Sequence, residues 1–317
     1  MVYIAGWGRA GSTLLAALLN TFPGALAAGE VRSLWVHGPI GRRLCGCGVQ
    51  IVDCPVWHFV LKAVPSPRSL EPAEVEEYQR RHLRTRDYLA AWPRALLRVR
   101  PPIAAERYAM TLYRAYEEIA RVSDASVIID SSKYPLDAYL LASLTPIDLR
   151  VVHLVRDPRA VAHSWSRPKQ RHVSHQAAND HMRQFSPAAS TTIWSLWNGV
   201  IETVLRRAVR NRVLTVRYED LLERPDEVLA STAAFADLDP AAGPSMRNHE
   251  VELGRNHMIA GNPVRFDRGT ITLSLDDEWR TNMSALSTAL ATLPALPWLH
   301  RYGYPVRPEV ATNPAGT

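Results

Sequence analysis

Short apolar runs alternate along the chain with longer stretches of helical periodicity. Residues 2–5 form an apolar run of β-type composition that meets a Gly-rich turn, and a strongly helical run starts at Leu14. Apolar β-type runs recur at residues 127–130, 150–155 and 212–217. Strands that alternate with helices in this way favour an α/β fold built on a parallel sheet.

Helical patterns fill the intervals between these runs. Residues 71–91 are highly charged and predict a solvated helix, residues 104–122 predict an amphipathic helix, and residues 191–209 predict a long one. A basic stretch at residues 165–187 is expected to be a flexible loop. Residues 35–122 therefore form a long insertion between the first two predicted strands, which we interpret as a helical lid on the acceptor side.

The turn after the first run has the composition of an anion-binding loop. Gly6 and Gly11 are separated by four residues, as in the Walker A loop, but Ser12 stands where that loop carries its lysine. Arg9 is the strong cation of the loop, and Ser12 and Thr13 add hydroxyl groups. Backbone N–H groups of such a loop and of the following helix converge on one point. The pattern predicts a P-loop-NTPase-like sheet with a phosphate-type anion site, although Gly-rich turns also occur without a ligand.

Composition limits the class of protein. The 317 residues fit one domain, predicted at 1–307, followed by a flexible Pro-, Ala- and Thr-rich tail at 308–317. A hydrophobic content of 47% is ample for a packed core. The excess of arginine over lysine is typical of a high-GC bacterial genome, and it makes Lys133 conspicuous.

Charge and hydropathy bear on partners and location. The net charge of +6 suits an acidic ligand and would equally suit nucleic acid. We expect no nucleic-acid partner, because the sequence shows no repeat of aromatic and basic residues. The first residues enter a strand at once and no apolar run reaches membrane-spanning length. These features predict a cytoplasmic protein that does not associate with a membrane.

Charged residues follow two further candidate positions at the edge of the sheet. Glu30 comes directly after a glycine beyond the first helix, where a carboxylate could act as a general base. The alternative is a surface acid paired with Arg32. Lys133 lies at the end of the strand predicted at 127–130, where active groups gather in parallel sheets. A surface lysine is the alternative at that position.

A second cradle for a phosphate follows the strand predicted at 150–155. Arg156 comes at the end of the strand, Asp157 has the character of a helix N-cap, and Pro158 that of a first helical residue. Ser164 lies two helical turns beyond Asp157 on the same face. An arginine and a serine in this arrangement can bind one phosphate group.

The three cysteines fall within one short stretch. Cys45, Cys47 and Cys54 precede His58, and three thiols with an imidazole could bind zinc. The Cys-x-Cys spacing departs from the usual zinc knuckle and no second pair follows. We therefore expect ordinary thiols and no metal, with the metal site and a disulfide as alternatives. The histidines at 172, 175 and 181 lack a metal-binding spacing and are expected to be solvated.

Two anion cradles without the Walker lysine resemble the sulfotransferases that use 3′-phosphoadenosine 5′-phosphosulfate (PAPS). Residues 6–15 look like the 5′-phosphosulfate loop, in the arginine-bearing form of the Golgi-type and bacterial branches. Residues 154–165 look like the 3′-phosphate motif of the family. Residues 217–221 are similar to a further family stretch, and residues 261–269 resemble the C-terminal segment that closes over the nucleotide.

The resemblance implies roles for individual residues. Residues 29–32 are similar to the Gly-Glu-x-Arg of tyrosylprotein sulfotransferases, which implies that Glu30 is the general base. Lys133 matches a lysine that contacts the leaving oxygen, and Arg9 would add positive charge, so these three form the expected catalytic set. The catalytic histidine of the cytosolic branch is missing, and neither His58 nor His153 is assigned that role.

The remaining implied residues bind the two substrates. Those expected to bind PAPS are Gly8, Arg9, Ala10, Gly11, Ser12, Thr13, Arg156, Ser164, Tyr218, Asn262, Arg265, Arg268 and Gly269. Those expected on the acceptor side are Glu30, Arg32, Trp35 and Trp57.

The sequence thus predicts an enzyme that moves a sulfuryl group from PAPS to an alcohol or phenol of a small molecule, for example a bacterial secondary metabolite. No metal is expected to be required, because a sulfuryl group carries less negative charge than a γ-phosphate. Two alternatives stay open: a catalytically inactive regulatory protein that binds the nucleotide, and a small-molecule kinase that needs ATP and magnesium. The identity of the acceptor and the oligomeric state stay open as well.

Overall fold

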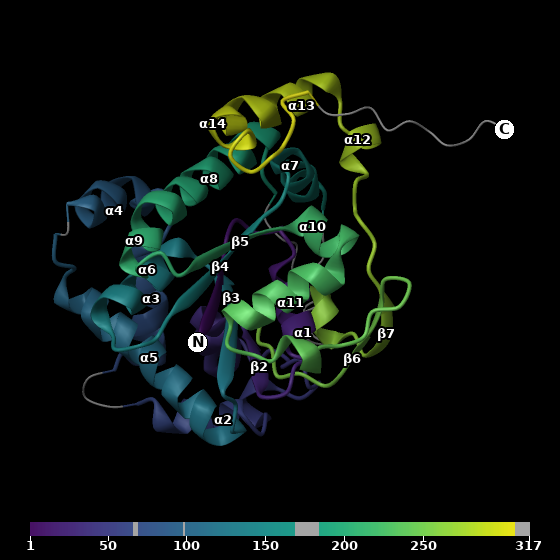
Figure 1. Cartoon of the computed structure of the whole chain (residues 1–317). Coiled ribbons are helices and arrows are strands. Elements are labelled where there is room, and N and C mark those ends of the chain that lie inside the picture. Colours follow the sequence, from purple (N-terminus) through teal and green to yellow (C-terminus); the bar gives the residue numbers. More distant parts are fainter. Residues whose placement is uncertain (66–68, 98, 169–183, 308–317) are drawn as a thin grey trace.

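The protein is built on a parallel five-stranded sheet in the order β2-β3-β1-β4-β5 (Figure 1). This computed structural model describes all residues except 66–68, 98, 169–183 and 308–317, so the predicted tail and most of the predicted loop at 165–187 lie outside the described residues. The strands of the sheet are β1 (Val2–Ala5), β2 (Ala25–Gly29), β3 (Val127–Lys133), β4 (Arg150–Val155) and β5 (Val213–Arg217). The predicted α/β class and parallel sheet are confirmed.

Alternating side chains of the sheet enter two separate hydrophobic cores. Along β1, Val2 and Ile4 pack into one core, whereas Tyr3 and Ala5 pack into the other. Successive side chains of a strand point to opposite faces, so a strand covered on both faces is apolar throughout. This explains why the shortest apolar runs of the sequence were sufficient to predict central strands.

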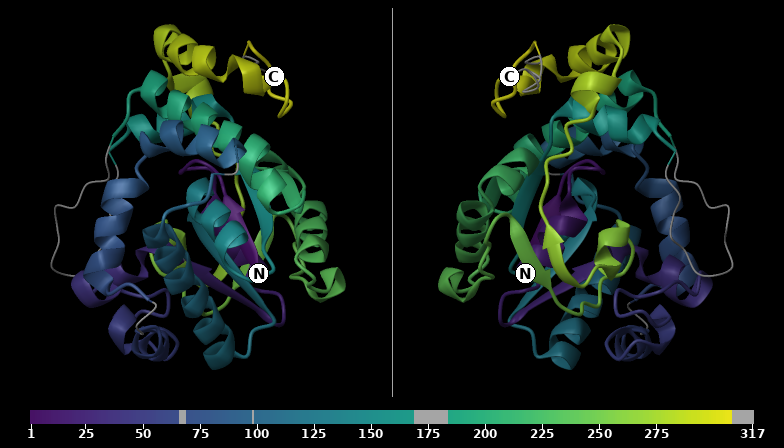
Figure 2. Two further views of the ribbon diagram at one scale, coloured as in Figure 1. Left: turned by 90° about the vertical axis from the view of Figure 1, so that its left-hand side faces the viewer. Right: turned by 90° about the vertical axis from the view of Figure 1, so that its right-hand side faces the viewer.

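Helices cover both faces of the sheet (Figures 1 and 2). One core lies beneath α1 (Ser12–Leu19), α10 (Tyr218–Glu223), α11 (Pro225–Phe235) and a hairpin of β6 (Glu250–Leu253) and β7 (Gly269–Thr272). The other core lies beneath the helices α5 (Ile103–Ser123), α6 (Pro135–Leu144) and α8 (Pro187–Val200). The result is the helix–sheet–helix sandwich expected for a parallel sheet.

The insertion begins one strand later than the sequence indicated. Strand β2 was not predicted, because its Ala-rich sequence lacks the β-branched and aromatic residues that are typical of strands. The insertion at 35–122 therefore separates β2 from β3. It contains the helices α2 (Trp57–Ala63), α3 (Pro72–His82) and α4 (Asp87–Leu96), and nearly all of α5.

The single helix predicted at 71–91 is wrong, because the chain turns between α3 and α4. The carboxylate of Asp87 accepts a hydrogen bond from the backbone N–H of Arg84 at 2.7 Å and closes this turn. Asp, like Asn and Ser, offers the backbone such a local alternative to helix. The helix predicted at 104–122 is confirmed as α5.

The C-terminal part packs against the end of the sandwich. The long helix predicted at 191–209 is α8, followed without a break by the π-helical turn η4 (Ile201–Leu205) and α9 (Arg206–Ala208). Three short helices, α12 (Trp279–Asn282), α13 (Ala285–Thr292) and α14 (Leu296–Leu299), lie beyond α8 and α7 (Pro158–Ser166) (Figure 2). Within the part of the chain that the structure describes, no helix is both long and apolar enough to cross a membrane.

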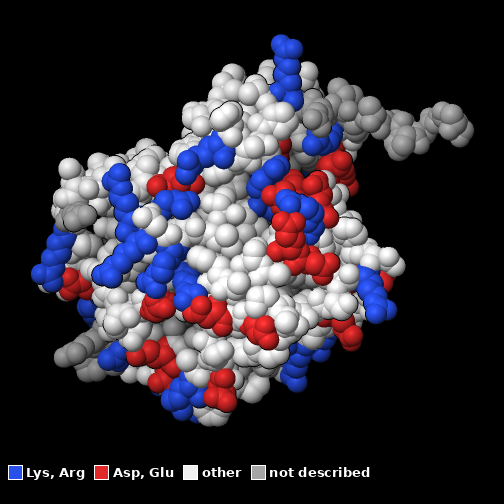
Figure 3. All heavy atoms as spheres, viewed as in Figure 1, with Lys and Arg blue, Asp and Glu red and all other residues white. Residues whose placement is uncertain are grey.

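Basic and acidic side chains are intermixed on the face shown in Figure 3. Ion pairs of the structure include Arg150 with Asp237 and Arg212 with Asp148. The basic residues relevant to a ligand lie instead at the carboxyl ends of the strands.

Candidate active site

A cavity of about 830 Å³ lies where the carboxyl ends of all five strands meet. Strand β1 leads into the Gly-rich loop, and the other four strands contribute the next residues of the lining. These residues are Glu30 after β2, Lys133 at the end of β3, Arg156 after β4 and Tyr218 after β5. Ligands of parallel α/β sheets bind at this edge, beside the strand where the order reverses. Here that strand is β1, which pairs with both β3 and β4.

The Gly-rich loop is held in an unusual backbone conformation. Gly11 has φ of 89°, and a Cβ atom there would come within 2.4 Å of the Tyr218 ring. Arg9 also has a positive φ, 72°, and its guanidinium lies 4.9 Å from the centre of the Trp165 ring. Thr13 accepts a hydrogen bond at 3.0 Å from the backbone N–H of Asn262. The loop is therefore fixed by contacts from distant parts of the chain.

Arg156 joins the loop to the second cradle. Its Nη1 donates to the carbonyl of Arg9 at 3.2 Å, its Nη2 donates to the carbonyl of Asp276 at 2.7 Å, and the guanidinium stacks on Tyr218 with a 4.4 Å separation. The buried Nε of Arg156 has no hydrogen-bond partner among the described residues. Ser164 lines the same cavity from α7. A buried donor without a partner is costly, which makes this position suitable for an anionic ligand.

The start of α7 is anchored as the sequence predicted. The side chain of Asp157 caps the helix by accepting a hydrogen bond from the backbone N–H of Arg159 at 2.8 Å, and Pro158 is the first helical residue. Glu219 accepts a hydrogen bond from the backbone N–H of Asp157 at 2.9 Å and another from the Tyr304 hydroxyl at 2.8 Å. Burial raises the pKa of Glu219. The stretch at 217–221 thus supplies both a cavity residue, Tyr218, and the anchor of the second cradle.

Glu30 and Lys133 form an ion pair at the cavity wall. Their side chains are 17% and 16% exposed, so both reach the cavity without being fully solvated. Lys133 has φ of 77° at a register shift between β1 and β3, and its carbonyl accepts a hydrogen bond at 3.1 Å from the backbone N–H of Gly6. A non-glycine residue in the left-handed region stores backbone strain, which concentrates at functional sites.

Arg265 is a second basic residue near Glu30. Burial lowers the pKa of Arg265 to about 10, although the nearby carboxylate of Glu30 acts to raise it. The Nη1 of Arg265 donates to the carbonyl of Gly261 at 2.9 Å, whereas its buried Nε has no hydrogen-bond partner among the described residues. Two basic side chains, Lys133 and Arg265, therefore act electrostatically on one carboxylate.

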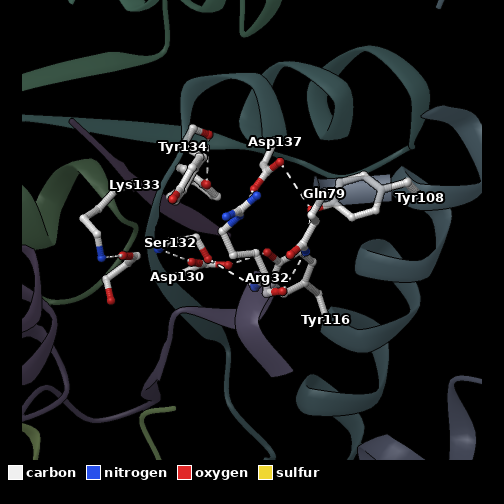
Figure 4. Close-up of polar contacts among 11 residues, drawn as sticks. Arg32, Gln79, Tyr108, Tyr116, Asp130, Ser132, Lys133, Tyr134 and Asp137 are labelled. Atoms are coloured by element: carbon white, nitrogen blue, oxygen red, sulfur yellow. Dashed lines mark hydrogen bonds and ion pairs between the residues drawn. The ribbon is translucent and has the colours of Figure 1, made fainter. Parts of the chain in front are cut away.

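A buried network behind Lys133 supports this wall (Figure 4). Arg32 forms an ion pair with Asp137 at 2.6 Å, and its guanidinium lies 3.5 Å from the centre of the Tyr134 ring. Asp130 accepts hydrogen bonds from the Tyr116 hydroxyl and from the backbone N–H of Ser132. Burial raises the pKa of Asp130 to about 7. The network fixes the strand end from which Lys133 projects.

The chain matches a known protein family over most of its length. A family model described as a sulfotransferase domain covers residues 2–258. The chain belongs to the sulfotransferase family. The predicted family and the prediction of an enzyme are thereby confirmed.

Solved structures show how the fold of this sulfotransferase compares with others. The sulfotransferase domain of the Synechococcus PCC 7002 olefin synthase is 22% identical, with a TM-score of 0.50, and the match covers 96% of this chain and 94% of that one. A sulfotransferase domain from the curacin biosynthetic pathway is 13% identical, also with a TM-score of 0.50, and the match covers 97% and 98%. No curated protein matches the chain. At these identities the structural likeness establishes the fold alone.

Most of the residues predicted for PAPS binding in this sulfotransferase meet at the cavity. Those that line it are Gly8, Arg9, Gly11, Ser12, Thr13, Arg156, Ser164, Tyr218, Asn262 and Arg265. The side chain of Ala10 is buried within the loop. Arg268 donates instead to the carbonyl of Gly46 at 3.3 Å, and Gly269 begins β7. Neither Arg268 nor Gly269 is among the lining residues.

Two of the four residues predicted on the acceptor side are core residues. Trp35 is 2% exposed and Trp57 is fully buried, with its indole N–H donating to the carbonyl of His257 at 2.7 Å. This corrects the prediction that these two tryptophans line the acceptor site. Glu30 and Arg32 do line the cavity. The sequence around an aromatic residue of a lid does not show whether its side chain faces a ligand or a core.

The aromatic residues that do line the cavity come from other elements. Trp7 packs against Trp165, Phe185 and Trp197 at centroid separations of 5.4, 5.7 and 4.8 Å. Tyr134 packs against Trp197 at 4.8 Å. Sequence reasoning missed this aromatic wall, although Trp7 lies inside the Gly-rich loop and Trp165 directly follows Ser164, which are positions that the two cradles bring to the cavity.

Proposed function

We propose that this sulfotransferase moves a sulfuryl group from PAPS to the hydroxyl of a small molecule, with Glu30 as general base. The observation that carries the proposal is the convergence of two anion cradles and the Glu30–Lys133 ion pair on one cavity. One cradle is the loop after β1 and the other consists of Arg156 and Ser164. A nucleotide that carries phosphate groups at both the 3′ and the 5′ position of its ribose would occupy both cradles.

The residues present fit such a donor. The loop amides, Arg9 and the hydroxyls of Ser12 and Thr13 would hold its phosphosulfate end, because backbone N–H groups at a helix N-terminus favour anions. Arg156 would hold the 3′-phosphate with the Nε that has no partner among the described residues. Ser164 would add a hydroxyl donor. Charge-assisted hydrogen bonds of this kind are about twice as strong as neutral ones.

The chemistry assigned to this chain consists of one proton transfer and charge stabilisation. Glu30 would accept the proton of the acceptor hydroxyl as its oxygen forms a bond to sulfur. The bond between sulfur and the bridging oxygen of the phosphate breaks in the same in-line step. Lys133 and Arg9 would stabilise the negative charge that develops on that oxygen. By analogy with phosphoryl transfer, positioning and electrostatics supply most of the catalysis.

The aromatic wall supports an apolar or aromatic skeleton for the acceptor. Trp7, Trp197 and Tyr134 contribute to the lining of the cavity that the Glu30–Lys133 pair also lines. Burying an apolar group of the acceptor against them would contribute roughly 25 cal/mol for each Å² removed from water. The two similar structures come from an olefin synthase and from a biosynthetic pathway, which supports an acceptor from bacterial secondary metabolism.

Calorimetric titration tests the donor. We expect strong binding of 3′-phosphoadenosine 5′-phosphate, the product left after transfer, and weak binding of 5′-AMP and of magnesium ATP. A preference for magnesium ATP would contradict the proposal and favour a small-molecule kinase. The acceptor is then sought by incubating the enzyme with PAPS and a panel of alcohols and phenols of increasing apolar area, and measuring the sulfated product by mass spectrometry. Binding without turnover of any phenol or alcohol would contradict the proposed reaction.

A further inference from the structure

The three cysteines of the chain, all buried, form one cluster with the half-buried His257, and the proposed reaction does not use it. Cys45, Cys47 and Cys54 are buried, and the ligand atoms of the four residues all lie within 4.8 Å of one another. The Sγ of Cys54 lies 3.2 Å from Nδ1 of His257 and 3.8 Å from the Sγ of Cys47. The Sγ of Cys45 lies 4.0 Å from Nδ1 of His257.

Separations of this size are those of a tetrahedral metal site. Zn–S bonds of about 2.3 Å place two thiolate ligands of a tetrahedron roughly 3.8 Å apart. Three thiols and one imidazole form a soft donor set that prefers zinc to magnesium or calcium. Four protein ligands leave no open position, which is the arrangement of structural rather than catalytic zinc sites.

The sequence could not identify the fourth ligand. His58 was the candidate, but its Nδ1 lies 3.0 Å from the carbonyl oxygen of Val52 and it is not part of the cluster. His257 takes its place from 203 residues beyond Cys54. A ligand at that separation is brought in by the fold, so no local spacing announces it.

The backbone around the cluster already holds the two parts together. The N–H of Gly46 donates to the carbonyl of Met258 at 2.9 Å, and a Cβ atom on Gly46 would approach the side-chain oxygen of Asn256 to 2.0 Å. The Trp57 indole N–H donates to the carbonyl of His257 at 2.7 Å. These contacts fix the backbone of His257 and Met258 beside the loop that carries Cys45 and Cys47.

We propose that Cys45, Cys47, Cys54 and His257 bind one structural zinc ion. The ion fastens the beginning of the insertion to the C-terminal segment at 256–265. That segment supplies residues 260–265 of the cavity lining, and it is closed on itself by Asn256, whose side-chain amide donates to the carbonyl of Arg265 at 2.9 Å. The zinc site lies outside the cavity lining and takes no part in the proposed proton transfer.

Metal analysis of the full chain, purified without a metal-affinity step, tests the proposal directly. We expect one zinc per chain by elemental mass spectrometry, released when the thiols are modified with an organomercurial. Replacement by cobalt should give the intense visible bands of a tetrahedral site and the charge-transfer bands of thiolate ligands. These measurements use the natural chain and do not depend on the identity of the donor or the acceptor.

Two variants locate the site. The substitution His257→Ala should weaken zinc binding in competition with a chelator by more than the roughly 100-fold that loss of an outer partner can cost. The matched control His58→Ala removes the other candidate imidazole and should retain the affinity of the natural chain. Circular dichroism reports whether each variant is folded. If His257→Ala does not fold, the cobalt spectrum of the natural chain still tests the metal site.

Three results would overturn the proposal. The first is a native protein that contains no zinc, takes up none on incubation with zinc, and has three thiols that all react freely with a disulfide reagent. The second is a disulfide between two of the three cysteines in protein purified under reducing conditions. The third is a His257→Ala variant that binds zinc as tightly as the natural chain. If zinc binds but PAPS does not, the metal site stands and the proposed function fails.

Discussion

Replacing Arg156 by alanine tests the proposed 3′-phosphate site most directly. Arg156 is 5% exposed, and its guanidinium donates to the carbonyls of Arg9 and Asp276 and stacks on Tyr218. Alanine removes the positive charge from the cavity and also these supporting contacts. A simple loss of nucleotide affinity would therefore mix a ligand contact with a structural effect.

Comparing two ligands separates the two effects. 3′-Phosphoadenosine 5′-phosphate and 5′-AMP share the adenosine and the 5′-phosphate, and they differ in the 3′-phosphate. Damage to the loop through Arg9 weakens both, so it cancels in the ratio of their dissociation constants. A charge-assisted hydrogen bond contributes about 1.5–3 kcal/mol. Its loss should reduce the ratio of the dissociation constant of 5′-AMP to that of 3′-phosphoadenosine 5′-phosphate roughly 10- to 150-fold.

The assay is calorimetric titration of both ligands against the natural chain and two variants. The control is Arg167→Ala, which removes an exposed arginine directly after α7 that is paired with Glu278. This variant should leave the ratio unchanged, because a charge in high dielectric interacts weakly. Equal weakening of both ligands by Arg156→Ala would refute the assignment, since the 3′-phosphate would then make no specific contact with Arg156.

Three further predictions follow from the structure. Glu30→Gln should lower kcat by about 10²- to 10⁴-fold, measured as the rate of product formation. Its affinity for 3′-phosphoadenosine 5′-phosphate, measured by calorimetry, should change only a few-fold. Retained turnover would exclude Glu30 as the base. The raised pKa of Asp130, about 7, favours the folded state fully below pH about 4 and loses that contribution as the pH rises to about 7. Between pH about 4 and about 7, the free energy of unfolding of Asp130→Asn should therefore rise by up to roughly 4 kcal/mol relative to that of the natural chain. Urea titrations at several pH values measure this difference, and a difference that does not change with pH would contradict the reasoning. Gly29→Ala should destabilise by more than about 2 kcal/mol, because φ is 77° and the Cβ would meet the carbonyl oxygen of Ile259 at 2.4 Å, whereas the control Gly254→Ala meets no atom within 4 Å; equal melting temperatures would refute this.

The central strands and the cradles could be predicted because their signals are local. The strands at 2–5 and 150–155 are apolar on both faces, and each is followed at once by a Gly-rich or Asp-Pro turn. A parallel sheet brings the residues after its strands to one edge, so the sequence alone was sufficient to place Arg9, Lys133 and Arg156 at the same edge. The resemblance to the sulfotransferase family then followed from the order of the motifs along the chain.

The remaining features depend on contacts between distant segments. Strand β2 is Ala-rich and forms because β3 pairs with it and Ile259 covers its end. The burial of Trp35 and Trp57 and the selection of His257 rather than His58 are likewise properties of packing. Local composition is the same whether an indole faces a ligand or a core, so the sequence alone could not separate these cases.

One segment, residues 256–265, contacts the Gly-rich loop and Glu30 and carries one member of the Cys–His cluster. Ile259 accepts a hydrogen bond at 2.7 Å from the N–H of Glu30, and Asn262 donates to Thr13 at 3.0 Å. His257, at the start of the same segment, belongs to the cluster with Cys45, Cys47 and Cys54. Substitutions coupled through a shared backbone shift have non-additive effects, whereas distant independent sites have additive effects. Substitutions at His257 and at Thr13 should therefore be non-additive in their effect on nucleotide affinity, which a double-mutant cycle measures. Strict additivity would show that the segment does not transmit order from the cluster to the loop.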